Sequence, residues 1–300
     1  MQFQQTLNKS YIFEGKGLHT GRVAKMTVGP APVDTGIVFR RVDLGEDVAV
    51  EALAENVSNT ARSTTISKGQ ASVATIEHIL SALTGLGVDN AFIDIDNVEV
   101  PILDGSAKPY IDAMWKDGVN VQDAPRKWVE VKEAIEVTNE NGSLVRIEPA
   151  EDFVYNITTD FKSRVLGVQT ASWDSSVVYA EEIGVCRTFV FFHELQFLFA
   201  NNLVKGGDVD NAIVIVEHPV TDEQVAQMSQ LFNVPALKVR EDGYLSNLTL
   251  RFPNECSRHK LLDLIGDLRL AGGFLKAKVT AVKAGHGINT QAALKVREQK

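Results

Sequence analysis

Residues 258–268 read Arg-His-Lys-Leu-Leu-Asp-Leu-Ile-Gly-Asp-Leu, a stretch in which polar side chains recur inside an apolar pattern. His259, Asp263 and Asp267 are spaced four residues apart, so a helix places them along one face, one turn after another. The leucines and the isoleucine around them predict that this helix is largely buried. Buried carboxylates need a compensating charge. The stretch therefore predicts a central helix whose buried carboxylates lie beside a compensating positive charge.

The same spacing suits a metal ion. Imidazole and carboxylate are ligands that Zn²⁺ accepts, and two of them on consecutive helical turns can reach one ion without bending the backbone. A pair such as His259 and Asp263 is more often a surface ion pair, and the spacing alone does not separate these two interpretations. The apolar flanks favour the metal site.

Composition limits the class of protein. The chain has 300 residues, 44% of them hydrophobic, which is enough for two compact domains. No segment approaches the roughly 18 consecutive apolar residues that a membrane span needs. The first residues lack an apolar signal segment, and the two cysteines are too few for a disulfide framework, so we expect a cytoplasmic protein.

The charge bears on the partner. A net charge of −9 argues against a nucleic-acid partner, because binding phosphates by counterion release needs a basic face. Basic residues near the polar helix, such as Lys260, leave room for a small anionic substrate, although ordinary surface charge explains each of them equally well.

Hydrophobic patterning divides the chain into two halves. In the first half we expect short β-segments, then a helix and a strand, at residues 24–28, 36–39, 48–50, 75–86 and 89–96. A polar stretch at 122–127 then marks a domain boundary, which we place between residues 124 and 125.

The second half repeats this logic. We expect strands at 128–137, 143–148 and 155–161, helices at 221–232 and from about 256, and a strand pair around 276–283. Strands and helices do not alternate regularly, so an α+β fold of layered sheets and helices is favoured over a doubly wound parallel sheet. Each half has one helix with a histidine, His78 and His259, which is a weak sign of duplication.

Residues 74–80, Ala-Thr-Ile-Glu-His-Ile-Leu, place a carboxylate beside an imidazole near the start of the first of these helices. Neighbouring helical residues point about 100° apart. If His78 binds a metal ion, Glu77 cannot easily share that ion, but it can lie beside an activated water, where a general base belongs.

Gly285-His286-Gly287 follows a strand pattern, and the flanking glycines let backbone or substrate approach closely. We expect a loop here, at the end of a strand, where functional residues collect. His286 could protonate a leaving group, with Asp267 as the partner that orients it.

Two further patterns have ordinary explanations. His193-Glu194 begins like a zincin motif, but Phe197 stands where the second ligand must be, so this is no metalloprotease site. Residues 189–199 hold five phenylalanines, for which core packing is the default explanation. An apolar channel for an acyl chain is the sharper alternative, and Gly206-Gly207 would permit a close backbone approach to it.

Seven blocks, in order along essentially the whole chain, resemble the UDP-3-O-acyl-N-acetylglucosamine deacetylases, zinc amidohydrolases of lipid A biosynthesis in Gram-negative bacteria. The blocks are Gly17-Leu18-His19-Thr20-Gly21, Pro30-Ala31-Pro32 with Thr35-Gly36, Thr75-Ile76-Glu77-His78, Pro101-Ile102-Leu103-Asp104-Gly105-Ser106, Arg187-Thr188-Phe189, residues 258–268, and Gly285-His286. Residues 254–259 look most like the Bacteroidetes branch, some of whose members continue into a fused dehydratase domain.

The resemblance implies that His78, His259 and Asp263 bind Zn²⁺, although Fe²⁺ suits the same ligands. The other catalytic roles that it implies are a general base for Glu77, a general acid or electrostatic partner for His286, an orienting carboxylate for Asp267, a hydrogen-bond donor to the oxyanion for Thr188, and a neighbour of the anionic part of the substrate for Lys260. The residues that it implies for substrate binding are Leu18, His19, Thr20, Phe189, Phe191 and Lys260.

The resemblance also implies two similar α+β domains with the active site at their interface. The first, residues 1–124, carries Glu77 and His78. The second, residues 125–300, carries His259, Asp263, His286 and an apolar insert near 189–215 that forms a passage for the 3-O-acyl chain. No function is assigned to residues 217–249.

The reaction implied is hydrolysis of the N-acetyl group of UDP-3-O-(3-hydroxyacyl)-N-acetylglucosamine, which gives acetate and the free amine in an early committed step of lipid A biosynthesis. Two alternatives stay open: a catalytically inactive protein that only binds this acylated UDP-sugar, and a metal hydrolase with a different N-acyl substrate.

Overall fold

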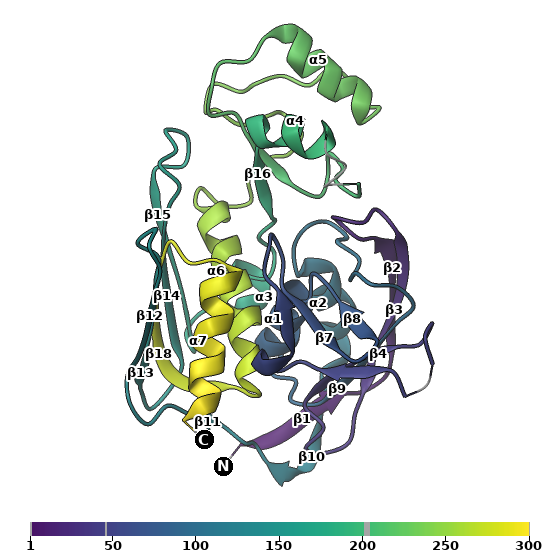
Figure 1. Cartoon of the computed structure of the whole chain (residues 1–300), viewed down its shortest axis with the longest axis vertical. Coiled ribbons are helices and arrows are strands. Elements are labelled where there is room, and N and C mark those ends of the chain that lie inside the picture. The colour runs from purple at the N-terminus through teal and green to yellow at the C-terminus, as the bar shows by residue number, and fades with distance from the viewer. Residues whose placement is uncertain (1, 46, 201–204, 300) are drawn as a thin grey trace.

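The computed structural model describes residues 2–45, 47–200 and 205–299. The chain is an α+β protein in which two sheets lie on either side of a layer of helices, and a smaller group of elements extends from one end (Figure 1). Within the described residues, no helix has the length and apolar character needed to cross a bilayer.

The two large sheets have the same topology. The first has the order β2 (Tyr11–Lys16), β3 (Val23–Pro30), β9 (Ala91–Ile95), β4 (Ile37–Arg41), β5 (Ala49–Glu51). The second has the order β12 (Ile135–Thr138), β13 (Leu144–Pro149), β18 (Leu275–Val282), β14 (Val154–Asp160), β15 (Val168–Asp174), and β11 (Val129–Glu130) also pairs with β18. In both sheets the successive pairings are antiparallel, antiparallel, parallel and antiparallel.

The helices repeat in the same way. In the first half α1 (Glu77–Gly85) precedes the central strand β9 and α2 (Lys108–Met114) follows it. In the second half α6 (Glu255–Leu268) precedes β18 and α7 (His286–Glu298) follows it. The expected pair of similar α+β domains is thus confirmed by an identical order of strands and helices. The boundary between residues 124 and 125 lies within β10 (Val119–Pro125), which pairs with β1 (Phe3–Leu7), and it stays a prediction.

Each half has an insertion at the same point, between its fourth strand and its buried helix. In the first half, this insertion contains the short helix η1 (Ala54–Asn56) and a sheet of β6 (Val57–Asn59), β7 (Thr65–Lys68) and β8 (Ala71–Val73). In the second it contains α3 (Tyr179–Glu182), β16 (Phe189–Phe191), α4 (Phe192–Ala200), β17 (Ile213–Ile215) and α5 (Asp222–Leu231). The last four form the group at the top of Figure 1. Residues 201–204 of the insert predicted near 189–215 lie outside the described residues.

Three expectations for the second half need correction. A single strand, β18, stands where a strand pair was expected around 276–283, and the predicted strand at 128–137 is two short strands with a break between them. His286 does not lie in a loop, because it is the first residue of α7. The buried face of that helix includes Ala292 and Ala293, whose small side chains give a weak periodic signal in the sequence.

The buried helices of the two halves cross at close range. Gly266 on α6 faces the backbone of α1, and a Cβ atom at this position would lie 2.0 Å from the carbonyl oxygen of Glu77. A glycine is therefore required for the two helices to pack at this distance. This contact places the start of α1 beside the last turn of α6.

We expect Gly266→Ala to lower the free energy of unfolding by about 1–3 kcal/mol, because the added methyl group overpacks the crossing. Alanine favours a helix by about 1 kcal/mol over glycine, so a net loss has to come from the contact with α1. Urea unfolding measures the difference. Gly285→Ala is the control, since a Cβ there meets no atom within 4 Å. Equal stability changes in the two variants would contradict this account of the crossing.

Candidate metal and active site

The three expected metal ligands lie together at the helix crossing. His78 comes from α1, and His259 and Asp263 come from consecutive turns of α6. All three are buried, and their ligand atoms lie within 4.8 Å of one another. Nε2 of His78 and Nε2 of His259 are 3.5 Å and 3.4 Å from Oδ1 of Asp263. This group could hold a metal ion.

The polar atoms of the group fit such an ion. Oδ1 of Asp263 is buried and accepts no hydrogen bond from the described residues, which is costly for a carboxylate unless a cation sits beside it. Nδ1 of His259 lies 3.1 Å from the carbonyl oxygen of Cys186, so Nδ1 is the protonated donor and Nε2 keeps its lone pair. Burial lowers the pKa of His259 to about 3, which keeps the imidazole neutral. Imidazole nitrogen and carboxylate oxygen are ordinary donors to metal ions.

The ammonium group of Lys260 is bound to the same carboxylate. Its Nζ donates to Oδ2 of Asp263 at 2.7 Å and lies 5.5 Å from the centre of the Phe189 ring. Lys260 therefore balances the charge of Asp263 at the edge of the site.

Glu77 is next to His78 and only 3% exposed. Its Oε2 accepts a hydrogen bond from the backbone N–H of Thr64 at 3.0 Å. Burial raises the pKa of Glu77 above its ordinary value, which moves this carboxylate toward the basicity that proton transfer near neutral pH requires. The side chain lines the same small cavity as the three candidate ligands.

A second group of polar side chains surrounds Asp267. Its Oδ2 accepts hydrogen bonds from Nδ1 of His286 at 3.0 Å and from Nδ2 of Asn289 at 2.9 Å, and its Oδ1 accepts one from Oγ1 of Thr64 at 2.5 Å. Asp267 is fully buried. It thus holds the ring of His286 through Nδ1.

The pKa of His286 follows from this contact. Burial alone would lower it, but the charge of Asp267 and its hydrogen bond outweigh burial and raise the pKa of His286 to about 9. With Nδ1–H donating to Asp267, Nε2 of the imidazolium presents the second proton.

One small cavity contains most of the expected site residues. Its lining consists of Leu18, His19, Arg62, Thr75, Glu77, His78, Ile102, Thr188, His259, Lys260, Asp263 and His286. Asp267 lies behind His286. Thr20 is not part of this lining, and its hydroxyl donates to Glu99 at 2.7 Å.

Sequence reasoning missed several residues that shape this site. Glu99 is 1% exposed and accepts hydrogen bonds from the backbone N–H groups of His19 and Thr20 and from the hydroxyl of Thr75. It therefore ties the 17–21 loop to the start of α1. The available signal was a lone acid between valines, in Val98-Glu99-Val100, where an apolar strand end would be expected. Arg62, in a left-handed conformation with φ of 70°, was also missed.

A larger apolar cavity of about 240 Å³ adjoins the small one. The residues common to both linings are Leu18, His19, Arg62 and Thr188. Its other walls come mainly from the insertion of the second half. They include Phe189, Val190, Leu195, Leu198, Val209, Ala212, Val214, Phe232 and Leu245. Residues 217–249, which had no assigned function, thus supply part of the wall.

The insertion is fastened to the first half at the 17–21 loop. The N–H of Gly206 donates to the carbonyl oxygen of Leu18 at 3.0 Å, and a Cβ at residue 206 would lie 2.1 Å from the carbonyl oxygen of Gly17. Gly206 therefore makes a close backbone approach to the 17–21 loop, whereas we expected such an approach to an acyl channel. Phe189 lines the apolar cavity, whereas Phe191 is outside its lining and packs near Phe161 and His193.

Known proteins are similar in sequence to this chain. A family model described as "LpxC: UDP-3-O-acyl N-acetylglycosamine deacetylase" matches residues 4–233 and 224–298. The chain is 41% identical over 300 residues to "Bifunctional enzyme LpxC/FabZ" of Porphyromonas gingivalis, which covers 100% of this chain and 65% of that protein. A protein of the same name from Bacteroides thetaiotaomicron is 38% identical over 99% of this chain and 64% of its own length.

The chain thus spans less than two thirds of these bifunctional relatives. It also matches "UDP-3-O-acyl-N-acetylglucosamine deacetylase" of Cellvibrio japonicus at 40% identity, over 99% of this chain and 91% of that protein. The family model matches nearly the whole chain. The similarity to both kinds of relative extends over at least 99% of this chain. The chain therefore belongs to the UDP-3-O-acyl-N-acetylglucosamine deacetylase family.

Proposed function

We propose that this chain removes the N-acetyl group from a UDP-3-O-(3-hydroxyacyl)-N-acetylglucosamine, with acetate and the free amine as products. Relatives such as the Cellvibrio japonicus protein take their name from this reaction. The observation that supports the proposal most is the shared wall of the two cavities. An amide bound at His78, His259 and Asp263 would leave the neighbouring acyl chain next to the apolar cavity.

We infer that the ion is zinc, with iron(II) as an alternative that the same donors accept. If bound by His78, His259 and Asp263, such an ion would polarise the amide carbonyl as a Lewis acid and would make a water molecule more acidic. Two hydrogen bonds orient the ligands. Nδ1 of His259 donates to the carbonyl oxygen of Cys186, and the ammonium group of Lys260 donates to Asp263.

Two side chains carry out the proton transfers. Glu77 takes the proton of the attacking water, because its carboxylate lines the cavity and burial raises its pKa. The leaving nitrogen receives its proton from Nε2 of His286, whose ring Asp267 holds through Nδ1. The hydroxyl of Thr188, which lies between the two cavities, is the proposed donor to the carbonyl oxygen as it becomes negative.

The substrate contacts are proposals of the same kind. Leu18 and His19 line both cavities and suit a contact at the branch between sugar and acyl chain. Thr20 would act through Glu99, and Phe191 by packing behind Phe189, with no direct contact.

The first test of the function is acetate release from the acylated UDP-sugar by the purified chain, before and after chelation and with zinc restored. Activity that disappears on chelation and returns with zinc supports the proposal. The alternative of an inactive binding protein predicts that the chain binds this acylated UDP-sugar without releasing acetate. No turnover after zinc is restored to folded protein would favour that alternative.

The apolar cavity predicts a strong dependence on the acyl chain. We expect a UDP-N-acetylglucosamine without the 3-O-acyl group to react with kcat/KM at least about 100-fold lower, because each buried methylene contributes roughly 0.8 kcal/mol. Leu195→Trp, which fills the cavity, should shrink this ratio by slowing only the acylated substrate. Phe197→Trp is the control, since residue 197 lies on the same helix but is 59% exposed. Equal rates on both substrates would instead favour a different N-acyl substrate.

The biological setting remains a prediction. A place in lipid A biosynthesis and a cytoplasmic location would follow from the proposed substrate. We also propose that the native protein carries a fused dehydratase domain, in line with the bifunctional relatives. The size of the native protein in cell extracts, detected with an antibody against this chain, would test the fusion.

A further inference from the structure

Thr64 lies between the proposed general base and the carboxylate that holds the proposed general acid. Its backbone N–H donates to Oε2 of Glu77 at 3.0 Å, and its Oγ1 donates to Oδ1 of Asp267 at 2.5 Å. Its carbonyl oxygen accepts from the N–H of Ile76, the residue directly before α1, at 3.3 Å. Thr64 is fully buried. Each of its polar groups is thus bound to the start of α1 or to the last turn of α6.

The local backbone holds Thr64 at this place. The next residue, Thr65, begins β7, which pairs with β6 on one side and with β8 on the other. Two residues earlier, Arg62 has a φ of 70°, a conformation that residues with a side chain rarely adopt. Such conformations persist where the surrounding structure determines them, and they cluster at functional sites. The turn between β6 and β7 therefore presents Thr64 to both helices in a defined orientation.

The hydroxyl of Thr64 determines which oxygen of Asp267 faces His286. In the described part of the chain, Thr64 is the only donor to Oδ1, whereas Oδ2 accepts from Nδ1 of His286 and from Nδ2 of Asn289. A buried carboxylate oxygen without a donor is costly, so loss of the hydroxyl would favour rotation of the carboxylate toward other donors. Rotation would disturb the two hydrogen bonds on Oδ2. The hydroxyl thus keeps the ring of His286 in place through Asp267.

The backbone N–H of Thr64 acts on Glu77 in a similar way. It occupies Oε2, and no described residue donates to Oε1. The side chain of Glu77 lines the small cavity. The contact therefore selects Oε1 as the oxygen that is left for proton transfer.

We propose that Thr64 is a positioning residue, which sets the carboxylate of Glu77 and the ring of His286 in their places relative to each other. This inference rests on the proposed function, because it takes these two groups as the base and the acid. Thr64 lines neither cavity and so acts only through Glu77 and Asp267. A misplacement of about 1 Å in a reacting group can lower a rate by roughly 10²-fold, which makes such positioning measurable.

Thr64→Val tests the contact to Asp267, because it replaces the hydroxyl by a methyl group and keeps the backbone N–H. We expect kcat to fall by about 10–100-fold, with KM within about threefold of the wild type and with the wild-type metal content. Thr64→Ser has the hydroxyl and should keep kcat within about threefold of the wild type. If Thr64→Val does not fold, Thr64→Ala makes the same test.

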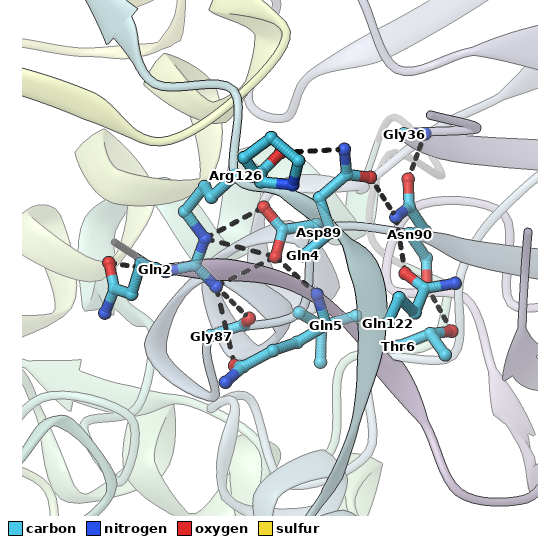
Figure 2. Close-up of polar contacts among 12 residues, drawn as sticks. Gln2, Gln4, Gln5, Thr6, Gly36, Gly87, Asp89, Asn90, Gln122 and Arg126 are labelled. Atoms are coloured by element: carbon cyan, nitrogen blue, oxygen red, sulfur yellow. Dashed lines mark hydrogen bonds and ion pairs between the residues drawn. The ribbon is translucent and has the colours of Figure 1, made fainter. Parts of the chain in front are cut away.

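Thr6→Val is the matched control for loss of a buried threonine hydroxyl. The hydroxyl of Thr6 donates to the carbonyl oxygen of Asn90 at 2.7 Å. Figure 2 shows Thr6 beside Asn90 in a separate polar network, whose labelled residues line neither the small cavity nor the apolar one. Both valine variants should unfold at a lower urea concentration than the wild type, but Thr6→Val should keep kcat within about twofold.

The proton on Nδ1 of His286 gives a readout that does not depend on turnover. In chain labelled with ¹⁵N-histidine, its hydrogen bond to a carboxylate should give a downfield NMR signal, assigned by its absence from His286→Ala. We expect this signal to move upfield or to disappear through exchange in Thr64→Val, and to persist in Thr64→Ser and Thr6→Val. This measurement stays valid if the wild-type chain releases no acetate, so failure of the proposed function and failure of this inference are distinguishable.

A merely structural role for Thr64 makes different predictions. A wild-type kcat in folded Thr64→Val would overturn the proposal, and so would an unchanged signal from Nδ1 of His286. Loss of kcat that accompanies loss of metal, that Thr6→Val shares, or that Thr64→Ser does not restore would overturn it as well.

Discussion

Glu77→Gln is expected to lower kcat by roughly 10²–10⁴-fold while the chain keeps its fold and its metal. Glutamine has the volume of glutamate and retains an oxygen that can accept from the N–H of Thr64, so the local structure should persist. It cannot take a proton from water at neutral pH. Because residue 77 is not among the three candidate ligands, elemental analysis of the variant should give the wild-type metal content.

Glu51→Gln serves as the control for loss of a carboxylate in the same half of the chain. Glu51 is half-buried and pairs with Lys68 away from the cavities, so its replacement should leave kcat within about twofold. If Glu77→Gln retains more than about a fifth of the wild-type kcat, Glu77 is not the general base. Comparable activity would then direct attention to His286 as the group that activates water.

The helical spacing in residues 258–268 predicted one face with His259, Asp263 and Asp267, and we expected Asp263 beside a metal ion and Asp267 beside His286. Successive positions four residues apart turn by about 40° on a helix of 3.6 residues per turn. Asp263 consequently faces His78 and His259, whereas Asp267 faces His286, Asn289 and Thr64. The one face read from the sequence is therefore two neighbouring sites.

Other parts of the site could not be read from local patterns, because they depend on contacts between distant residues. The hydrogen bond from Thr64 to Asp267 joins residues 203 positions apart, and Glu99 orders a loop 80 positions earlier. The similar topology of the halves was detectable only as two helices with a histidine each. The aromatic run left core packing and an apolar channel as alternatives, and the different positions of Phe189 and Phe191 depend on the packing of the insertion.

His259→Ala is expected to lose both the metal ion and at least about 10³-fold in kcat, which separates it from Glu77→Gln. The substitution removes one of three donors and leaves Oδ1 of Asp263 facing a single imidazole. Wild-type chain should contain about one zinc or iron per molecule by elemental analysis. His218→Ala, at an exposed histidine in the insertion, is the control and should retain the metal.

Loss of metal and turnover in His259→Ala, with loss of turnover alone in Glu77→Gln, would separate the binding of the ion from proton transfer to a carboxylate. A folded wild-type chain that holds no metal when purified without chelators would mean that His78, His259 and Asp263 form only a buried polar cluster. In that case Lys260, which already donates to Oδ2 of Asp263, would balance the charge of that carboxylate, and the proposed hydrolysis would have no Lewis acid.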